Sequence, residues 1–254
     1  MRVGPEIFIE TVPIRPDNYS YLLTWGHFVT VIDASEADPI LQLVRSRNLQ
    51  LLAVLSTHHH SDHTLGNMEL KEKTGCSVIS TDRRVKGVDR VVGDGEIISL
   101  EGVEIRAVLV PGHTKHQAAF YLESQKSLFT GDTLFGAGCG RVFEGSADQM
   151  YRSLEKLGSY PDETSVYFGH EYTAENLEFA LSVEPGNRDV VGRLERVKET
   201  LSGGGYSTPS TVREEKRTNP FLRCRELSIR KALDMVDRSP IAVFAELRRR
   251  KDLF

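Results

Sequence analysis

Seven of the eight histidines lie in three short motifs, and this clustering constrains the fold more than any other feature of the sequence. Residues 57–63 read Thr-His-His-His-Ser-Asp-His, which contains the pattern H-x-H-x-D-H directly after the apolar run Leu51–Leu55. Three further predicted strands are each followed by a glycine and then by a candidate ligand: His113, Asp132 or His170. Because α/β scaffolds usually carry their chemistry in the loops at strand ends, we expect these side chains to be functional.

The residue types in these motifs predict a site for two metal ions. Alternate residues of an extended segment point the same way, so His58 and His60 can share one metal. Asp62 and His63, at the turn into the next helix, can face a second metal. Imidazole and carboxylate ligands of this kind suit zinc, iron or manganese. Four residues saturate neither metal, and the chain offers three further ligands: His113, Asp132 and His170.

The first 172 residues combine short strands with a few helices, which predicts a layered α/β body. Runs of β-branched, aromatic or other apolar residues predict ten strands: Ile7–Val12, Tyr19–Thr24, Phe28–Ile32, Leu51–Leu55, Ser77–Ser80, Ile97–Leu100, Val103–Val110, Ala118–Leu122, Leu128–Thr130 and Ser165–Phe168. Three stretches favour helix: Ala37–Ser46, His63–Thr74 and Ala147–Leu157, the last with Ser146 as its N-cap.

After residue 172 the character of the chain changes to helix. Four stretches favour helix there: Ala174–Leu181, Val190–Leu201, Glu226–Val236 and Ile241–Arg250. Between them Ser202–Pro209, rich in glycine and serine, predicts a flexible loop. We therefore expect a catalytic domain over residues 1–172 and a small helical domain over residues 173–254.

Composition excludes several classes of function. The formal net charge of −4 offers no attraction to nucleic acid or to an anionic membrane surface. The three scattered cysteines do not form a disulfide framework, and no segment approaches the ~18 apolar residues that span a bilayer. The first residues lack an apolar run of signal-peptide length, so we expect a cytoplasmic protein without nucleic-acid or membrane partners.

The order of these motifs resembles the metallo-β-lactamase superfamily, and the resemblance runs through the first ~170 residues. It implies an αββα sandwich carrying two divalent metal ions, for which we expect zinc, with iron or manganese as alternatives. Carried over, the first metal takes His58, His60 and His113. The second takes Asp62, His63 and His170, and Asp132 bridges the two. Asp62 and Asp132 would then be the catalytic carboxylates, acting as ligands; for Asp62 we expect an orienting role rather than proton donation.

Four further stretches resemble the glyoxalase II (hydroxyacylglutathione hydrolase) family within that superfamily: residues 131–145, 169–173, 183–187 and 217–223. The tail 247–254 is similar as well, so this resemblance covers essentially the whole chain. It implies a monomeric enzyme whose helical C-terminal domain completes the site for a small glutathione thioester. The contacts to glutathione would come from five residues: Arg141, Phe143, Tyr172, Arg248 and Lys251. Some relatives carry Tyr in place of Phe143, and others carry Lys in place of Arg141.

The implied reaction converts S-D-lactoylglutathione into glutathione and D-lactate, the second step of methylglyoxal detoxification. Two metal ions can lower the pKa of a shared water toward neutrality, and the hydroxide attacks the thioester carbonyl. The leaving thiol has an ordinary pKa near about 8.5, so it departs without strong acid assistance. No Gly-x-Ser-x-Gly elbow offers a serine nucleophile, and we interpret Cys139 as part of a tight glycine-rich loop.

Three other functions stay open at this point. An iron-dependent persulfide dioxygenase would use a related scaffold, but its relatives generally lack such a helical C-terminal domain. Another hydrolase of this fold could act on a lactone, a β-lactam or a phosphodiester. A non-catalytic metal-binding module should be free to lose ligands, and the full ligand set argues against it. His59 and His116 favour packing or supporting roles, and His27 stands alone.

Overall fold

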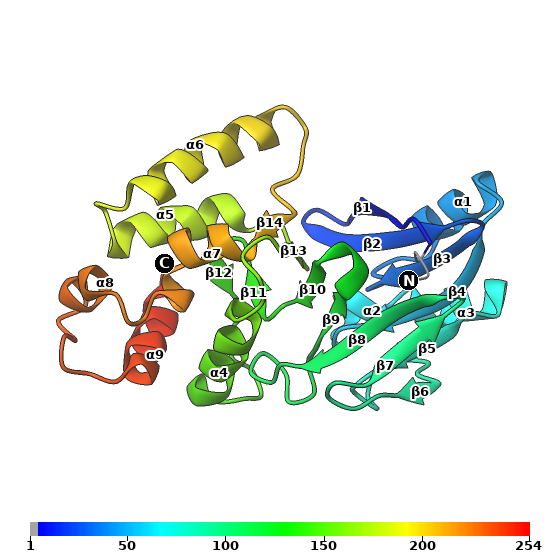
Figure 1. Ribbon diagram of the computed structural model, residues 1–254, viewed down its shortest axis with the longest axis horizontal. Coiled ribbons are helices and arrows are strands. Elements are labelled where there is room, and N and C mark those ends of the chain that lie inside the picture. Colours follow the sequence, from blue (N-terminus) through cyan, green and yellow to red (C-terminus); the bar gives the residue numbers. More distant parts are fainter. Residues whose placement is uncertain (1–4) are drawn as a thin grey trace. The chain divides into compact units, whose positions relative to one another are not determined.

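In the computed structural model, which describes residues 5–254, the chain divides into two compact units (Figure 1). Unit 1 contains the described residues up to Leu109 and the segment His116–Gly131. Unit 2 contains Val110–Lys115 and Asp132–Phe254. These two units do not coincide with the two domains predicted from the sequence, whose boundary lies between residues 172 and 173. The domain boundary stays a prediction.

The first sheet of unit 1 has six strands, in the order in which they occur along the chain. They are β1 (Phe8–Ile14), β2 (Asn18–Trp25), β3 (Phe28–Ile32), β4 (Gln50–Ser56), β5 (Ser77–Ser80) and β6 (Arg90–Val91). β1 to β3 pair antiparallel, whereas β3 to β6 pair parallel. Parallel neighbours require crossover connections, and the helices α1 (Asp38–Ser46), α2 (Ser61–Thr64) and α3 (Asn67–Thr74) lie in them. Apolar residues of α1 and α3 pack in one buried cluster with valines of β3, β4 and β5.

The second sheet of unit 1 is an antiparallel meander that follows the first along the chain. Its strands in unit 1 are β7 (Ile97–Leu100), β8 (Val103–Leu109), β9 (Ala118–Leu122) and β10 (Ser127–Gly131), with a 3-10 turn η1 (Glu123–Gln125) between the last two. Every residue of β9 and β10 is buried. The ring of Phe129 lies 5.5 Å from that of Tyr21 on β2, so side chains from both sheets share the core of this unit.

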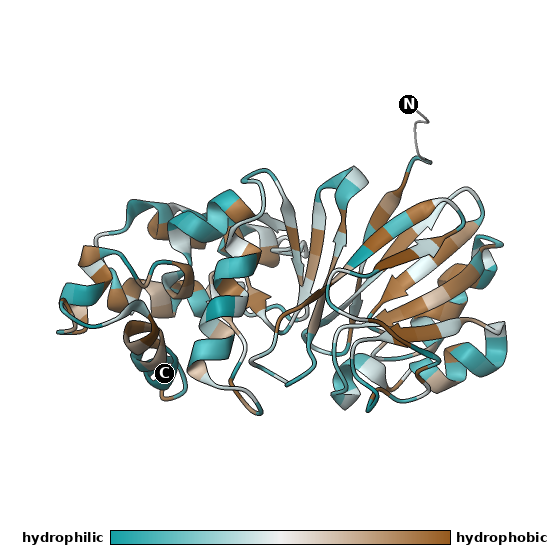
Figure 2. Cartoon of the chain, turned by 60° about the horizontal axis from the view of Figure 1, so that its bottom comes forward, coloured by the Kyte–Doolittle hydropathy of each residue, from teal (hydrophilic) through white to brown (hydrophobic). Residues whose placement is uncertain are grey.

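Unit 2 is mainly helical and has two small pairs of strands. One pair is β11 (Leu134–Phe135) with β12 (Gly138–Cys139), and the other is β13 (Ser165–Phe168) with β14 (Ser210–Thr211). The helices are α4 (Ala147–Gly158), α5 (Thr173–Val183), α6 (Arg188–Ser202), α7 (Val212–Thr218), α8 (Leu227–Ala232) and α9 (Pro240–Lys251), with the 3-10 turn η2 (Pro220–Leu222) after α7. Figure 2 shows hydrophilic residues along one side of several of these helices and hydrophobic residues along the other, the pattern of helices that cover a core.

All ten predicted strands and most predicted helices are confirmed to within a few residues. Ser146 caps α4 as predicted, and with Gln149 it forms a capping box. The helix predicted over 63–74 is instead two helices, because the Gly66 amide between them donates to the carbonyl of Ala34. The helix predicted over 226–236 ends at Ala232, shortly before Asp234 adopts the left-handed conformation with φ 57°. Within residues 5–254, no helix is long and apolar enough to cross a membrane.

Candidate metal centre

In unit 1, the residues of the H-x-H-x-D-H pattern follow β4 and lead into α2, which begins at Ser61. His58 and His63 are fully buried, and His60 and Asp62 are half-buried. The Nε2 atom of His58 lies 3.0 Å from Nδ1 of His60. The Nε2 atom of His63 lies 3.5 Å from a carboxylate oxygen of Asp62. The structure thus brings together the two pairs of neighbouring residues that the sequence predicts.

A buried carboxylate, Asp33, organises this segment from the end of β3. One oxygen accepts hydrogen bonds from the Thr57 hydroxyl at 2.8 Å and lies 2.9 Å from Nδ1 of His63. The other accepts from the Thr57 amide at 2.7 Å. The Thr57 hydroxyl lies 3.0 Å from Nδ1 of His58, so both buried imidazoles are held through Nδ1. Holding Nδ1 fixes the ring orientation and leaves Nε2 available as a ligand.

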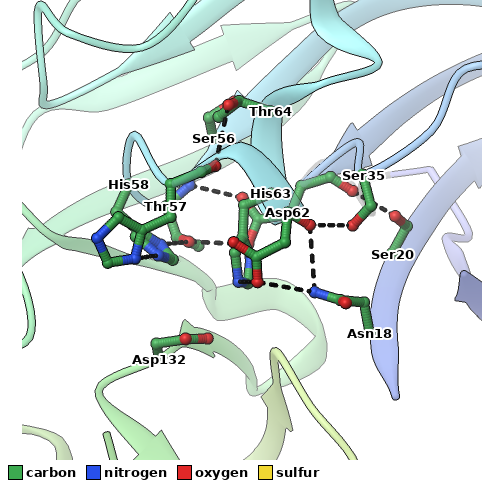
Figure 3. Close-up of polar contacts among 12 residues, drawn as sticks. Asn18, Ser20, Ser35, Ser56, Thr57, His58, Asp62, His63, Thr64 and Asp132 are labelled. Carbon is green, nitrogen blue, oxygen red and sulfur yellow. Dashed lines mark hydrogen bonds and ion pairs between the residues drawn. The ribbon is translucent and has the colours of Figure 1, made fainter. Parts of the chain in front are cut away.

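Asp62, in the first turn of α2, is held by polar side chains from earlier in the chain (Figure 3). The Asn18 amide donates to the Asp62 carbonyl at 3.1 Å and to its carboxylate at 3.3 Å. The Ser35 hydroxyl donates to the same carbonyl. These contacts set the direction of the Asp62 side chain without neutralising its charge, as a carboxylate ligand requires.

His59 faces a separate buried carboxylate. Its Nδ1 lies 3.2 Å from an oxygen of Asp82, which also accepts from the Arg84 guanidinium at 2.8 Å. Burial acts to raise the pKa of the Asp82 carboxyl, but the hydrogen bonds from Arg84 outweigh burial and hold that pKa below its ordinary value. Asp82 is therefore an anion beside His59, in keeping with a supporting role for this histidine.

In unit 2, three of the predicted ligands converge. His113, Asp132 and His170 are all nearly buried. One oxygen of Asp132 lies 3.5 Å from Nε2 of His113 and 3.4 Å from Nε2 of His170. Three strand-end residues, distant in sequence, therefore direct one oxygen and two imidazole nitrogens toward one another.

The orientation of His113 depends on the glycine-rich loop after β12. Nδ1 of His113 lies 2.8 Å from the carbonyl oxygen of Arg141, which leaves Nε2 facing Asp132. Gly140 makes this approach possible, because a Cβ there would lie 2.0 Å from the carbonyl oxygen of Asp132 and 3.1 Å from Nδ1 of His113. Any other residue at position 140 would displace one of these two ligands.

Three residues expected to contact glutathione lie beside the ligands of unit 2. The Tyr172 ring stacks on that of His170 with centroids 4.9 Å apart, and the Phe143 ring lies 5.2 Å from that of His113. Phe143 is 61% exposed, and the side chain of Arg141 is 67% exposed. These side chains are accessible to a small molecule, although their contacts with substrate stay predictions.

The two remaining candidates, Arg248 and Lys251, are engaged within unit 2. The Arg248 guanidinium is nearly buried, donates to the Cys139 carbonyl at 2.7 Å and pairs with Asp252 at 2.9 Å. The Lys251 ammonium donates to Glu175 at 2.9 Å and lies near two phenylalanine rings. Both cations already have acidic partners, which the spacing of basic residues in the sequence could not reveal.

Sequence reasoning missed Asp33, Asn18 and Asp252. Asp33 directly follows a predicted strand, the same signal that singled out Asp132, so it could have been found. Asn18 and Asp252 carry no local signal. Burial raises the pKa of the Cys139 thiol to about 11, so this cysteine is protonated at neutral pH, in keeping with its interpretation as a loop residue.

The fold and these ligand-type side chains define a member of the metallo-β-lactamase superfamily, whose family model matches residues 17–84 and 80–170. The family model for the hydroxyacylglutathione hydrolase C-terminus matches residues 171–254. A hydroxyacylglutathione hydrolase of Methylococcus capsulatus is 46% identical over 96% of this chain and 97% of its own length. One from Rhizobium meliloti is 44% identical over 94% and 96%. The chain belongs to the hydroxyacylglutathione hydrolase family.

A solved structure supports the fold independently. ETHE1 from Myxococcus xanthus superposes with a TM-score of 0.68 over 95% of this chain and 96% of its own, at 24% sequence identity. The predicted fold class is thereby confirmed.

The residues present fit divalent metal ions, as the family implies. The donor set contains only imidazole nitrogens and carboxylate oxygens, which zinc, iron and manganese accept. Two of the imidazoles bind a carboxylate or a carbonyl through Nδ1, the usual support for a histidine that ligates through Nε2.

Proposed function

We propose that this chain hydrolyses S-(2-hydroxyacyl)glutathione thioesters, with S-D-lactoylglutathione giving glutathione and D-lactate in the second step of methylglyoxal detoxification. The observation that carries the proposal is the near full-length similarity to hydroxyacylglutathione hydrolases at 46% and 44% identity. The match of residues 171–254 to the C-terminal model of that family supports it, because this region lies outside the match to the superfamily model.

We further propose two divalent metal ions, zinc first, with iron or manganese as alternatives. One would bind His58, His60 and His113. The other would bind Asp62, His63 and His170, and Asp132 would be shared. When bound, such ions lower the pKa of water and polarise a carbonyl, which is the chemistry that thioester hydrolysis needs. The motif order and the orientation of the ligands within each unit support this assignment.

The protein's own part in the reaction is orientation and charge. Asp33 and the Arg141 carbonyl hold His63 and His113 in one ring orientation, so these ligands need no rearrangement during the reaction. The exposed Arg141 guanidinium can pair with a carboxylate of glutathione. The thiolate leaves without a dedicated acid, since its parent thiol has an ordinary pKa of about 8.5.

The test follows loss of S-D-lactoylglutathione with purified protein before and after chelation, then after addition of zinc, iron or manganese. Hydrolysis should follow metal content. His113→Ala should abolish it, whereas His27→Ala, which changes an exposed histidine outside the ligand motifs, should not. A metal-loaded protein that leaves the thioester intact while cleaving a lactone would refute the proposed substrate. The monomeric state and the cytoplasmic location also stay proposals, and sedimentation would test the first.

A further inference from the structure

The β11–β12 hairpin spans Leu134–Cys139, and its segment Phe135–Cys139 is held by side chains of the C-terminal helical region. We propose that Asn176, Glu215, Asn219 and Arg248 are positioning residues that fix this hairpin and, through it, orient the ligands His113, Asp132 and His170. The helical region would then shape the metal site as well as bind substrate. This inference rests on the proposed metal centre, but its test does not require the proposed substrate.

Four carbonyl groups of the hairpin accept hydrogen bonds from these side chains. The Asn219 amide, just before η2, donates to the carbonyls of Gly138 at 2.9 Å and Phe135 at 3.4 Å. The Asn176 amide, on α5, donates to Gly136 at 3.0 Å. The Arg248 guanidinium, on α9, supplies the fourth bond, to Cys139, as described above. Side chains from three separate elements therefore converge on five consecutive residues.

The middle of the hairpin is tied by a buried ion pair. The Ala137 amide donates to Glu215 on α7 at 2.8 Å, and the other oxygen of Glu215 accepts from Arg193 at 2.6 Å. Glu215 is fully buried and Arg193 is 2% exposed. Ala137 has φ 53°, a left-handed conformation that is unfavourable for a residue with a side chain. A hairpin of two-residue strands cannot stabilise such a conformation alone, so the surrounding side chains must impose it.

The hairpin and the two residues that follow it contact each of the three ligands of unit 2. Gly140, directly after it, packs against the backbone of Asp132. Arg141 accepts the hydrogen bond that orients His113. The Phe135 ring lies edge-on to His170 with centroids 5.9 Å apart. A shift of the hairpin would therefore move the support of all three ligands together.

The experiment compares two isosteric substitutions with a matched control. Asn219→Asp and Asn176→Asp remove the amide donors to the hairpin. The control is Asn187→Asp. Like Asn219, Asn187 caps a helix through its side-chain oxygen, and its NH₂ group donates to a glutamate, Glu184, and to the carbonyl oxygen of Arg217. The side-chain hydrogen bonds of Asn187 reach Glu184, the Arg217 carbonyl and the start of α6 rather than the hairpin. Asn187→Asp and Asn219→Asp both keep the capping oxygen and both place a new carboxylate next to a glutamate, although Asn219 is the more buried of the two.

Two readouts that do not depend on turnover decide the outcome. Zinc affinity, measured by competition with a chelator, should fall about 10–100-fold in Asn219→Asp and by at least a few-fold in Asn176→Asp, as for outer residues that orient ligands. Amide hydrogen exchange of the peptide covering 134–141 should accelerate in both. In the control both quantities should match the parent protein. If the thioester is a substrate, kcat should fall more than KM rises.

The proposal is overturned if folded Asn176→Asp and Asn219→Asp bind zinc as tightly as Asn187→Asp does, or if segment 134–141 exchanges as in the control. If circular dichroism shows that Asn219→Asp does not fold, the test rests on Asn176→Asp, which loses only the hydrogen bond to the Gly136 carbonyl. If zinc affinity and exchange change as expected but S-D-lactoylglutathione is not hydrolysed, the positioning role stands and the proposed function fails.

Discussion

The buried ion pair between Glu215 and Arg193 offers the sharpest test of how unit 2 is stabilised. Glu215→Gln keeps the volume of the side chain but replaces one acceptor by a donor. Whichever way the new amide turns, its NH₂ group faces the Arg193 guanidinium or the donors from Ala137 and Asn219. Breaking such a pair costs about 3–5 kcal/mol, because one buried charge loses its partner. Glu214 lies 3.3 Å from Arg193 and compensates in part, so we expect the lower end, about 3 kcal/mol.

The adjacent residue supplies the control for this prediction. Glu214 is one-third exposed and pairs with Arg196, whose side chain is 64% exposed. Its longer contact with Arg193 is secondary to that of Glu215, which Glu214→Gln keeps. Glu214→Gln should therefore cost about 1 kcal/mol or less. Urea unfolding followed by circular dichroism measures both free energies of unfolding. At a slope of about 2–3 kcal/mol/M, Glu215→Gln should lower the midpoint by roughly 1–1.5 M. Equal losses in the two variants, or a loss below about 1 kcal/mol for Glu215→Gln, would refute the reasoning.

Two further predictions concern substrate affinity and acid stability. Asp252 pairs with Arg248 at 2.9 Å and lies 3.9 Å from Arg141, so its carboxylate competes with those of glutathione for these cations. Asp252→Asn should therefore lower KM for the thioester about two- to fivefold at unchanged kcat. Steady-state kinetics measures both constants, and a higher KM would contradict the prediction. Burial acts to raise the pKa of Glu184, but hydrogen bonds from Arg223 and its neighbours outweigh it and hold that pKa below the ordinary 4.5. Stability from Glu184 is thus present above pH 4.5 and lost as pH falls through the lower folded pKa, and Glu184→Gln should flatten the unfolding free energy against pH in that window.

The catalytic part of the fold was predictable because its signals are local. Apart from β6, the strands of unit 1 are runs of β-branched, aromatic or other apolar residues between turn residues, and Ser146 and Gln149 carry their capping box in the sequence itself. The strands that escaped prediction, β6, β11, β12 and β14, have two residues each. Two residues cannot display a periodic pattern, and these strands exist because of the partners that the rest of the chain supplies.

The same difference separates the ligands from their supports. His58, His60, Asp62 and His63 share one motif, so sequence alone could place them together. The contact between Nδ1 of His113 and the Arg141 carbonyl joins residues 28 positions apart and uses a backbone atom, which no residue type announces. Side-chain identity predicts which residues can ligate a metal, whereas the groups that aim them are backbone atoms and distant carboxylates.

The three cations expected to bind glutathione differ in their exposure and in their acidic partners. Arg141, Arg248 and Lys251 all stand where the family carries basic residues, yet only Arg141 is largely exposed. Arg248 and Lys251 can bind a carboxylate of glutathione only by exchanging an acidic partner that each already has, Asp252 or Glu175. Each such exchange trades one ion pair for another, so its net contribution to affinity is small. Arg141 should therefore contribute more to glutathione affinity than either C-terminal cation, and the burial of Arg248 beneath the Cys139 carbonyl makes its contribution chiefly one of position.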